Sequence, residues 1–181
     1  YAGHLKLETM SETRDNLLVE LNLATDLQFP LLEQLDQADH RYIKDLKINV
    51  SNALKFPNLN EKEAYLLALS VSVNQKHELT INSLTQKCIE KGATEAEINE
   101  IHALTSLLNA NNVFYRFKHF VDKEYYNTAP VGIRMSIMMN PVLGKEFFEL
   151  ASLAVSALNG CEMCVRSHEE SVRNHGASEA R

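Results

Sequence analysis

Apolar side chains recur at helical spacing along most of this chain. Two amphipathic helices are predicted in the first third, each closed by a proline. Their apolar positions are Leu17, Leu21 and Ala24, from Glu12 toward Pro30, and Ile43, Leu46, Val50 and Leu54, up to Pro57. Both patterns have the spacing of a helix that buries one face.

Capping signals indicate where the next helices begin. Asn60 with Glu63, and Thr94 with Glu97, have the spacing at which an N-cap side chain and a glutamate bind each other's backbone amides. The expected helices cover 61–73, 95–108, 113–124, 134–139 and 145–158. A further helix follows the first of these, runs through Cys88 and ends at Gly92. The sequence therefore predicts an all-α fold.

One stretch of the chain occurs twice. Residues 57–96 match residues 141–180 at a constant offset of 84, and 12 of the 40 pairs are identical. We interpret this match as a duplicated helical hairpin. The first copy continues into a helix from Ile98, so we expect the second copy's last C-terminal helix to be missing from this chain, which ends at Arg181.

Composition and charge exclude several classes of protein. The 181 residues are 45% hydrophobic with only 6 Gly and 4 Pro, which is typical of a helical domain with its own core. A net charge of −6 has the wrong sign for binding nucleic acid. No apolar run is long enough to span a membrane and no signal peptide is recognisable, so we expect a soluble, cytoplasmic protein.

The candidate chemistry lies in the second copy alone. Cys161, Cys164 and His168 stand where the first copy has a histidine, a threonine and a leucine. Asn-Gly before Cys161 ends one helix, so both cysteines fall in the first turn of the next, where the helix dipole favours a thiolate. At about 100° per residue, the three side chains share one helical face.

Three interpretations compete for this motif. A structural zinc site needs four ligands, and only a distant His175 or Glu149 could supply the fourth. Two buried, inert cysteines are a second interpretation. A dithiol that cycles through a disulfide, with His168 moving protons, is the third and the one we favour. A thioredoxin fold is excluded because no alternation of strands and helices surrounds the motif.

Several segments resemble the AhpD-like alkyl hydroperoxidases, relatives of the carboxymuconolactone decarboxylases. The matching segments are 148–150, 159–169, 111–116, 132–135 and 140–141, and the likeness covers roughly residues 33–181. The resemblance implies a duplicated all-α bundle, commonly a homotrimer. It also implies a single domain over 33–181, preceded by a helical N-terminal extension over 10–32. We expect residues 1–9 to be a non-native remnant ahead of a start at Met10.

The resemblance also implies residue roles. Cys164 becomes the thiolate that attacks the peroxide, Cys161 the proton donor and resolving thiol, and His168 and Glu149 the proton relay. Helix-dipole reasoning alone favours Cys161 as the more acidic thiol. Well-known members of the family carry a second histidine between the cysteines, whereas this chain has Met163, which cannot move protons.

The expected activity is reduction of organic hydroperoxides, and of a partner peroxiredoxin, in antioxidant defence. No tightly bound cofactor is expected, and dihydrolipoamide or a lipoylated protein is the implied electron donor. Two alternatives remain open: a disulfide-exchange protein without peroxidase activity, and a non-catalytic assembly protein that binds a metal. Cys88 is interpreted as a core residue, and the aromatic series over 114–126 as core or subunit interface.

Overall fold

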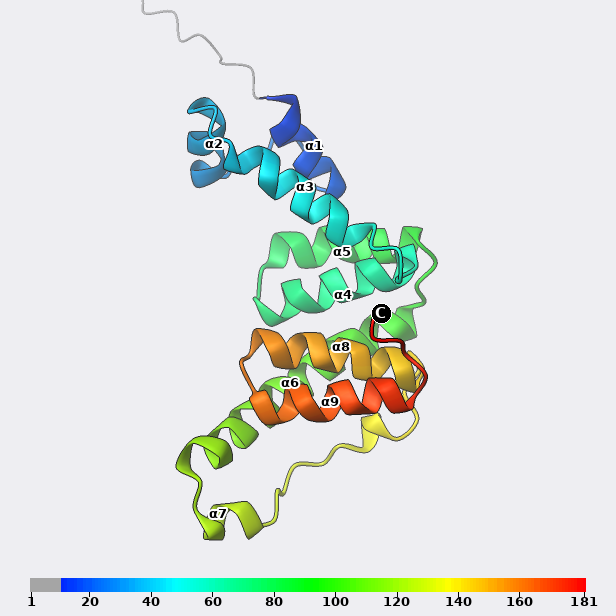
Figure 1. The fold of residues 1–181 in the computed structure, drawn as a ribbon. Coiled ribbons are helices and arrows are strands. Elements are labelled where there is room, and N and C mark those ends of the chain that lie inside the picture. Colours follow the sequence, from blue (N-terminus) through cyan, green and yellow to red (C-terminus); the bar gives the residue numbers. More distant parts are fainter. Residues whose placement is uncertain (1–10) are drawn as a thin grey trace, which may run out of the picture.

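A computed structural model describes residues 11–181, in which every regular element is a helix (Figure 1). The first helices are α1 (Glu12–Glu20), α2 (Pro30–Gln37), α3 (Tyr42–Leu54), α4 (Glu61–Asn74) and α5 (Glu78–Glu90). They are followed by α6 (Glu95–Val121), α7 (Glu124–Thr128), a 3-10 turn η1 (Ser136–Met138), α8 (Lys145–Leu158) and α9 (Glu162–Asn174). The all-α prediction is confirmed. The expectation for residues 1–9 lies outside the described residues.

Two helical hairpins, α4–α5 and α8–α9, form the centre of the molecule (Figure 1). Their helix bounds correspond at the same offset of 84 that relates the two sequence copies. The hairpins meet through α4 and α8, and the long helix α6 packs against both of these helices. The structure thus has the duplicated-hairpin architecture that the sequence repeat predicts.

The hydrophobic core lies where α4, α6 and α8 meet. Its most deeply buried members are Leu66, Leu69, Leu84, Ile101, Leu104, Leu108, Phe148, Ala151 and Val155. Cys88 on α5 belongs to this core, and burial raises the pKa of its thiol to about 12. A thiol that stays protonated is a poor nucleophile, so Cys88 acts as a packing residue, as the sequence indicates.

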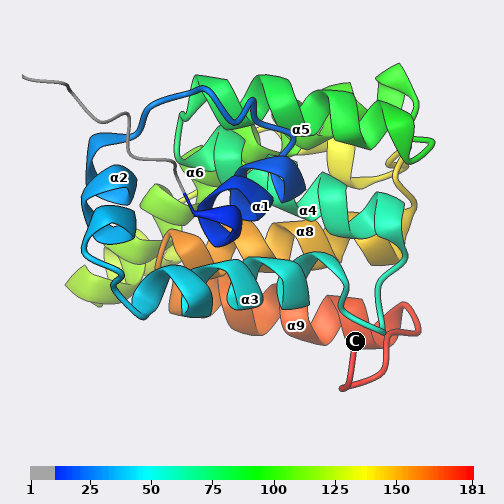
Figure 2. The same cartoon turned by 90° about the horizontal axis from the view of Figure 1, so that it is seen from above.

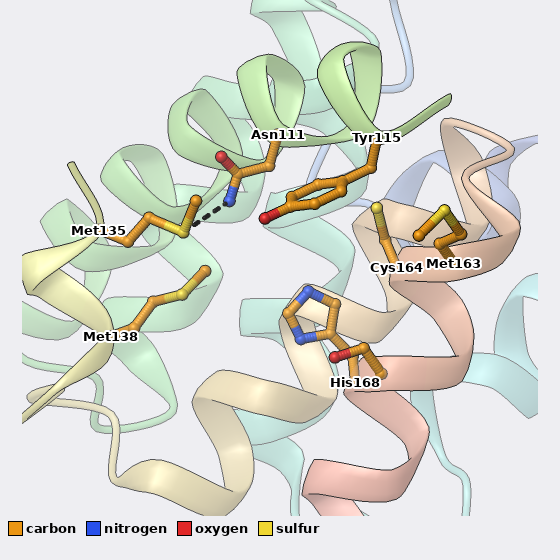
Figure 3. Close-up of a pocket in the computed structure, with 8 residues that line it drawn as sticks. Asn111, Tyr115, Met135, Met138, Met163, Cys164 and His168 are labelled. Carbon is orange, nitrogen blue, oxygen red and sulfur yellow. Dashed lines mark hydrogen bonds between the residues drawn. The ribbon is translucent and has the colours of Figure 1, made fainter. Parts of the chain in front are cut away.

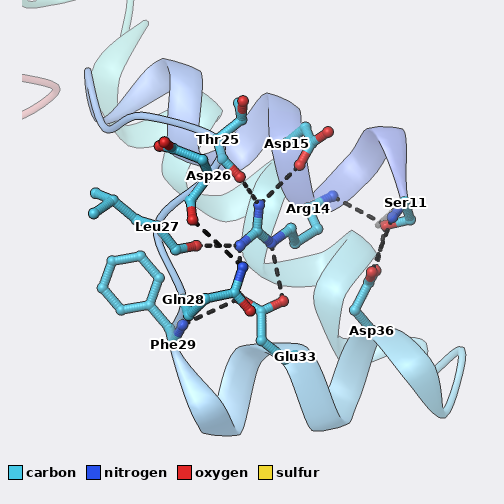
Figure 4. Close-up of polar contacts among 10 residues, drawn as sticks. All are labelled: Ser11, Arg14, Asp15, Thr25, Asp26, Leu27, Gln28, Phe29, Glu33 and Asp36. Atoms are coloured by element: carbon cyan, nitrogen blue, oxygen red, sulfur yellow. Dashed lines mark hydrogen bonds and ion pairs between the residues drawn. The ribbon is translucent and has the colours of Figure 1, made fainter. Parts of the chain in front are cut away.

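The N-terminal prediction is wrong in one respect, because α1 ends at Glu20 and does not continue past Leu21 toward Pro30. The cause is the buried guanidinium of Arg14, which binds the Glu33 carboxylate and two backbone carbonyls, those of Thr25 and Leu27 (Figure 4). In a helix through residues 21–29 the Thr25 carbonyl would accept from the backbone N–H of Phe29, and Arg14 would lose this partner in the interior. The chain therefore loops around Arg14, and Pro30 then opens α2.

Helices α1–α3 form a group that sits on the first hairpin (Figure 2). The Asn22 side chain donates to the carbonyl of Ser83 at 3.1 Å, and the Ser83 hydroxyl donates to the carbonyl of Leu21 at 2.8 Å. These bonds fasten the loop after α1 to α5. The N-terminal group therefore lies on the hairpin that lacks the cysteine pair.

The segment between α6 and α8 also differs from prediction. The helix expected over 134–139 is reduced to the three residues of η1, because Met135 has a non-helical φ of −129° and Pro141, which has no backbone N–H to donate, follows closely. This segment crosses beside α6 and returns to α8, which brings Met135 and Met138 to the cysteine site (Figure 3). No helix within residues 11–181 is both long and apolar enough to cross a membrane.

Candidate active site

The cysteine pair lies at the start of α9, directly after a sharp turn. Gly160 takes a φ of 67°, which glycine adopts without strain, and Cys161 is the N-cap of the helix. Its sulfur accepts a hydrogen bond from the backbone N–H of Cys164 at 3.3 Å. Cys161 and Cys164 form a disulfide, with their Cα atoms 5.3 Å apart. The predicted Cys-x-x-Cys pair can therefore close within one helical turn.

A network of amide side chains fixes this turn. Asn159 receives a hydrogen bond from Asn74 of α4 at 3.0 Å and donates to Asn112 of α6 at 2.9 Å. Arg116 donates to the backbone carbonyl of Asn159 at 2.6 Å, and Asn112 donates to the Ser156 hydroxyl at 3.0 Å. Helices α4 and α6 thus hold the loop that presents the cysteines.

The two sulfurs differ in access. Cys161 is fully buried, whereas Cys164 retains 6% exposure and lines a pocket of about 280 Å³. The other lining residues are Asn111, Tyr115, Met135, Met138, Met163, Ser167 and His168 (Figure 3). A molecule that enters the pocket therefore meets Cys164 before Cys161.

His168 and Glu149 are joined directly. His168 Nδ1 lies 2.6 Å from Glu149 Oε2, and the side chains are only 12% and 6% exposed. Glu149 sits on α8, so this contact depends on the antiparallel packing of α8 and α9. Figure 3 shows the imidazole ring reaching into the pocket on the side of Cys164 and Tyr115.

The pKa of Glu149 is lowered. Burial alone would raise it, but the hydrogen bonds and charges of His168 and Lys145 outweigh burial. A carboxylate at Nδ1 keeps the hydrogen on that nitrogen and leaves the lone pair of Nε2 for a proton from the pocket. The pair therefore has the arrangement of an oriented general base.

The structure brings all four predicted site residues together: Cys161, Cys164, His168 and Glu149. Met163 also lines the pocket, at 42% exposure. Within the described residues, no group of three or more His, Cys, Asp or Glu side chains could hold a metal ion. Here the two sulfurs are bonded to each other.

Sequence reasoning missed part of the site. Lys145 lies 3.2 Å from Glu149 Oε1, and its place four residues before Glu149 on one helix was a usable signal. Asn111, Tyr115 and Met135 fall inside segments that carry the family resemblance, but nothing in their spacing indicated a pocket.

Comparison with known proteins identifies the family of the chain. Residues 126–181 match the model of the Carboxymuconolactone decarboxylase family. An alkyl hydroperoxide reductase AhpD from Rhizorhabdus wittichii is 34% identical over 81% of this chain and 84% of its own length. AhpD proteins from Beijerinckia indica and Rhodococcus erythropolis are 38% and 36% identical, over 74% and 80% of this chain and 73% and 80% of their own lengths.

Fold and site define a helical protein with a redox-active cysteine pair. The chain belongs to the AhpD family of alkyl hydroperoxide reductases. This confirms the resemblance found in the sequence and the prediction of an enzyme of the alkyl hydroperoxide reductase class.

Proposed function

We propose that this protein reduces organic hydroperoxides with the Cys161–Cys164 dithiol and is returned to the dithiol form by a second dithiol. The observation that carries the proposal is one arrangement: a cysteine pair at a helix N-terminus, with only Cys164 reaching a pocket that His168 also lines. The apolar methionines of the pocket suit the organic part of such a substrate.

In the first step, His168 Nε2 accepts the proton of the Cys164 thiol. The thiolate attacks the terminal oxygen of the hydroperoxide, a sulfur–oxygen bond forms and the oxygen–oxygen bond breaks. Cys164 becomes a sulfenic acid, and the organic alkoxide takes up a proton and leaves as an alcohol. The anionic Glu149 stabilises the histidine while it holds the transferred proton.

In the second step, the Cys161 sulfur attacks the sulfenic sulfur of Cys164. The disulfide forms, and the hydroxyl of the sulfenic acid leaves with a proton as water. The bonded pair in the structure corresponds to this product. The N–H of Cys164 and the dipole of α9 favour a thiolate on Cys161 when it attacks.

Dihydrolipoamide, free or carried by a lipoylated protein, is our proposed reductant. Its two thiols would open the disulfide through a mixed disulfide and leave as the cyclic lipoamide disulfide, which balances the two electrons of the cycle. The pocket at Cys164 gives a small dithiol access to one sulfur only. A peroxiredoxin disulfide is a further proposed acceptor of electrons from the reduced pair.

The proposal is tested by hydroperoxide consumption with dihydrolipoamide in metal-free buffer. The wild type should turn over, and Cys164→Ser and Cys161→Ser should each abolish turnover. A Cys164→Ser variant with wild-type activity would refute the proposal.

Disulfide exchange without peroxide reduction is a second candidate, and Met163 favours it because this position cannot move protons. It predicts no hydroperoxide consumption, while the reduced protein still reduces a partner disulfide and Cys161→Ser traps that partner as a mixed disulfide.

A further inference from the structure

Lys145 occupies an unfavourable place in its helix. It is the first residue of α8, after Gly144, whose position provides no side-chain cap. The N-terminus of a helix carries a partial positive charge, so a lysine there is destabilising, whereas an acidic residue is stabilising. The first hairpin has the favourable residue, Glu61, at the equivalent position of α4. Lys145 therefore has a reason to be present other than helix stability.

The Lys145 ammonium group makes two contacts that meet at the pocket. It lies 3.2 Å from Glu149 Oε1 and donates to the backbone carbonyl of Met138 at 2.7 Å. Glu149 uses its other oxygen for His168, and Met138 lines the pocket. One side chain thus connects the buried carboxylate to the pocket wall opposite α9.

Two neighbouring side chains favour the charged form of Glu149 most strongly. They are His168 from α9 and Lys145 from its own helix. Since the Glu149 side chain is 6% exposed, little solvent could replace a lost partner.

We propose that Lys145 is a positioning residue of the site: it holds the Glu149 carboxylate turned toward His168, and it ties the backbone of Met138 in the pocket wall to that carboxylate. This inference rests on the proposed function in one point, that the pair of Glu149 and His168 takes the proton from Cys164.

Replacing Lys145 changes the balance of groups around Glu149. Burial, which opposes the charge, would then be offset mainly by His168, so the pKa of Glu149 rises. The relay works with an anionic Glu149. As the pH is lowered, the variant should therefore lose activity at a higher pH than the wild type does.

The test compares Lys145→Met with Lys145→Arg and with the control Lys62→Met. Lys62 is equally exposed, at 35%, and binds Glu97 at 2.9 Å, away from the pocket. Lys145→Met should lower kcat/KM for cumene hydroperoxide about tenfold and move the acid limb toward neutral pH. Lys145→Arg should restore most of the rate, and Lys62→Met should leave both rate and profile unchanged.

A double variant separates action through Glu149 from other effects. If Lys145 works through the carboxylate, Lys145→Met in the Glu149→Gln background should cost little more than Glu149→Gln alone. A full additional loss in that background would overturn the proposal. An unshifted acid limb in a folded Lys145→Met protein, verified by circular dichroism, would overturn it as well.

Alkylation of the reduced protein by iodoacetamide keeps this proposal separate from the proposed function. The reaction reports the Cys164 thiolate and needs no peroxide. A wild type that consumes no hydroperoxide, with an alkylation profile that Lys145→Met shifts to higher pH, would refute the peroxidase and support the role of Lys145. If the wild type consumes hydroperoxide and its alkylation profile is identical to that of Lys145→Met, the peroxidase is supported and the role of Lys145 is refuted.

Discussion

The hairpins α4–α5 and α8–α9 have equivalent helices but different side chains where the second helix begins. In both, the residue before the second helix is an N-cap whose side chain accepts the backbone N–H three residues on: His77 from Thr80 at 3.4 Å, and Cys161 from Cys164 at 3.3 Å. The cap is thus a structural position that either residue type can fill. The second hairpin can close a disulfide because both residues of its cap, Cys161 and Cys164, are cysteines.

The two hairpins also differ at the positions equivalent to Glu149 and His168. Where the second hairpin has Glu149 and His168, the first has Tyr65 and a buried Leu84. The helix bounds are unaffected by these exchanges. A duplicated scaffold can therefore acquire a site through a few side chains that meet between the two helices of a hairpin, without a change in the helix bounds.

The largest effect is expected when His168 is replaced by leucine, the residue that the first hairpin has at the equivalent position, Leu84. His168→Leu should lower the rate of hydroperoxide reduction at least about 100-fold, because the thiol loses its proton acceptor. The disulfide should still form slowly and be opened by dithiothreitol. Stopped-flow oxidation of the reduced protein measures the rate. The control variant His77→Asn changes the N-cap of α5 in the first hairpin and should leave this oxidation rate unchanged.

Glu149 should also make stability depend on pH in a way that Tyr65 cannot. Its pKa is lowered from the ordinary 4.5, so its charged form stabilises the fold above that pH, and the contribution is lost as pH falls through the lowered value. Thermal unfolding should show Glu149→Gln less stable by about 2 kcal/mol at pH 7, and this difference should shrink below pH 4.5. A difference that stays constant down to pH 3 would contradict this assignment.

The smallest effect is expected at Cys88, which stands where the second copy has Val172. Both side chains are buried in their hairpins. Cys88→Val should change the free energy of unfolding by less than about 1 kcal/mol and leave peroxide reduction unaltered. Urea denaturation checks the first and the dihydrolipoamide assay the second. A large loss of activity would show that a third thiol takes part.

Most of the fold and site followed from sequence, because their signals are local. Capping pairs, helical spacing and the repeat place α4–α6, α8 and α9, and the spacing of Cys161, Cys164 and His168 places them on one helical face. Glu149 required the family resemblance, since its contact with His168 depends on how two helices pack.

What sequence reasoning missed depends on contacts that periodicity does not report. The end of α1 is set by Arg14, whose partners include backbone carbonyls of a non-helical loop. Met135 and Met138 reach the pocket through a loop whose path no apolar pattern encodes. Lys145 fits a regular ion-pair spacing, but only its contact with Met138 shows why it matters.

The central claim is that Cys164 attacks the peroxide and Cys161 resolves it. The most direct test is mass spectrometry of reduced Cys161→Ser and Cys164→Ser after one equivalent of cumene hydroperoxide, with a sulfenic-acid trap present. The account predicts one trapped oxygen on Cys164 in Cys161→Ser and little or none on Cys161 in Cys164→Ser. Rapid trapping on Cys161, with none on Cys164, would contradict it.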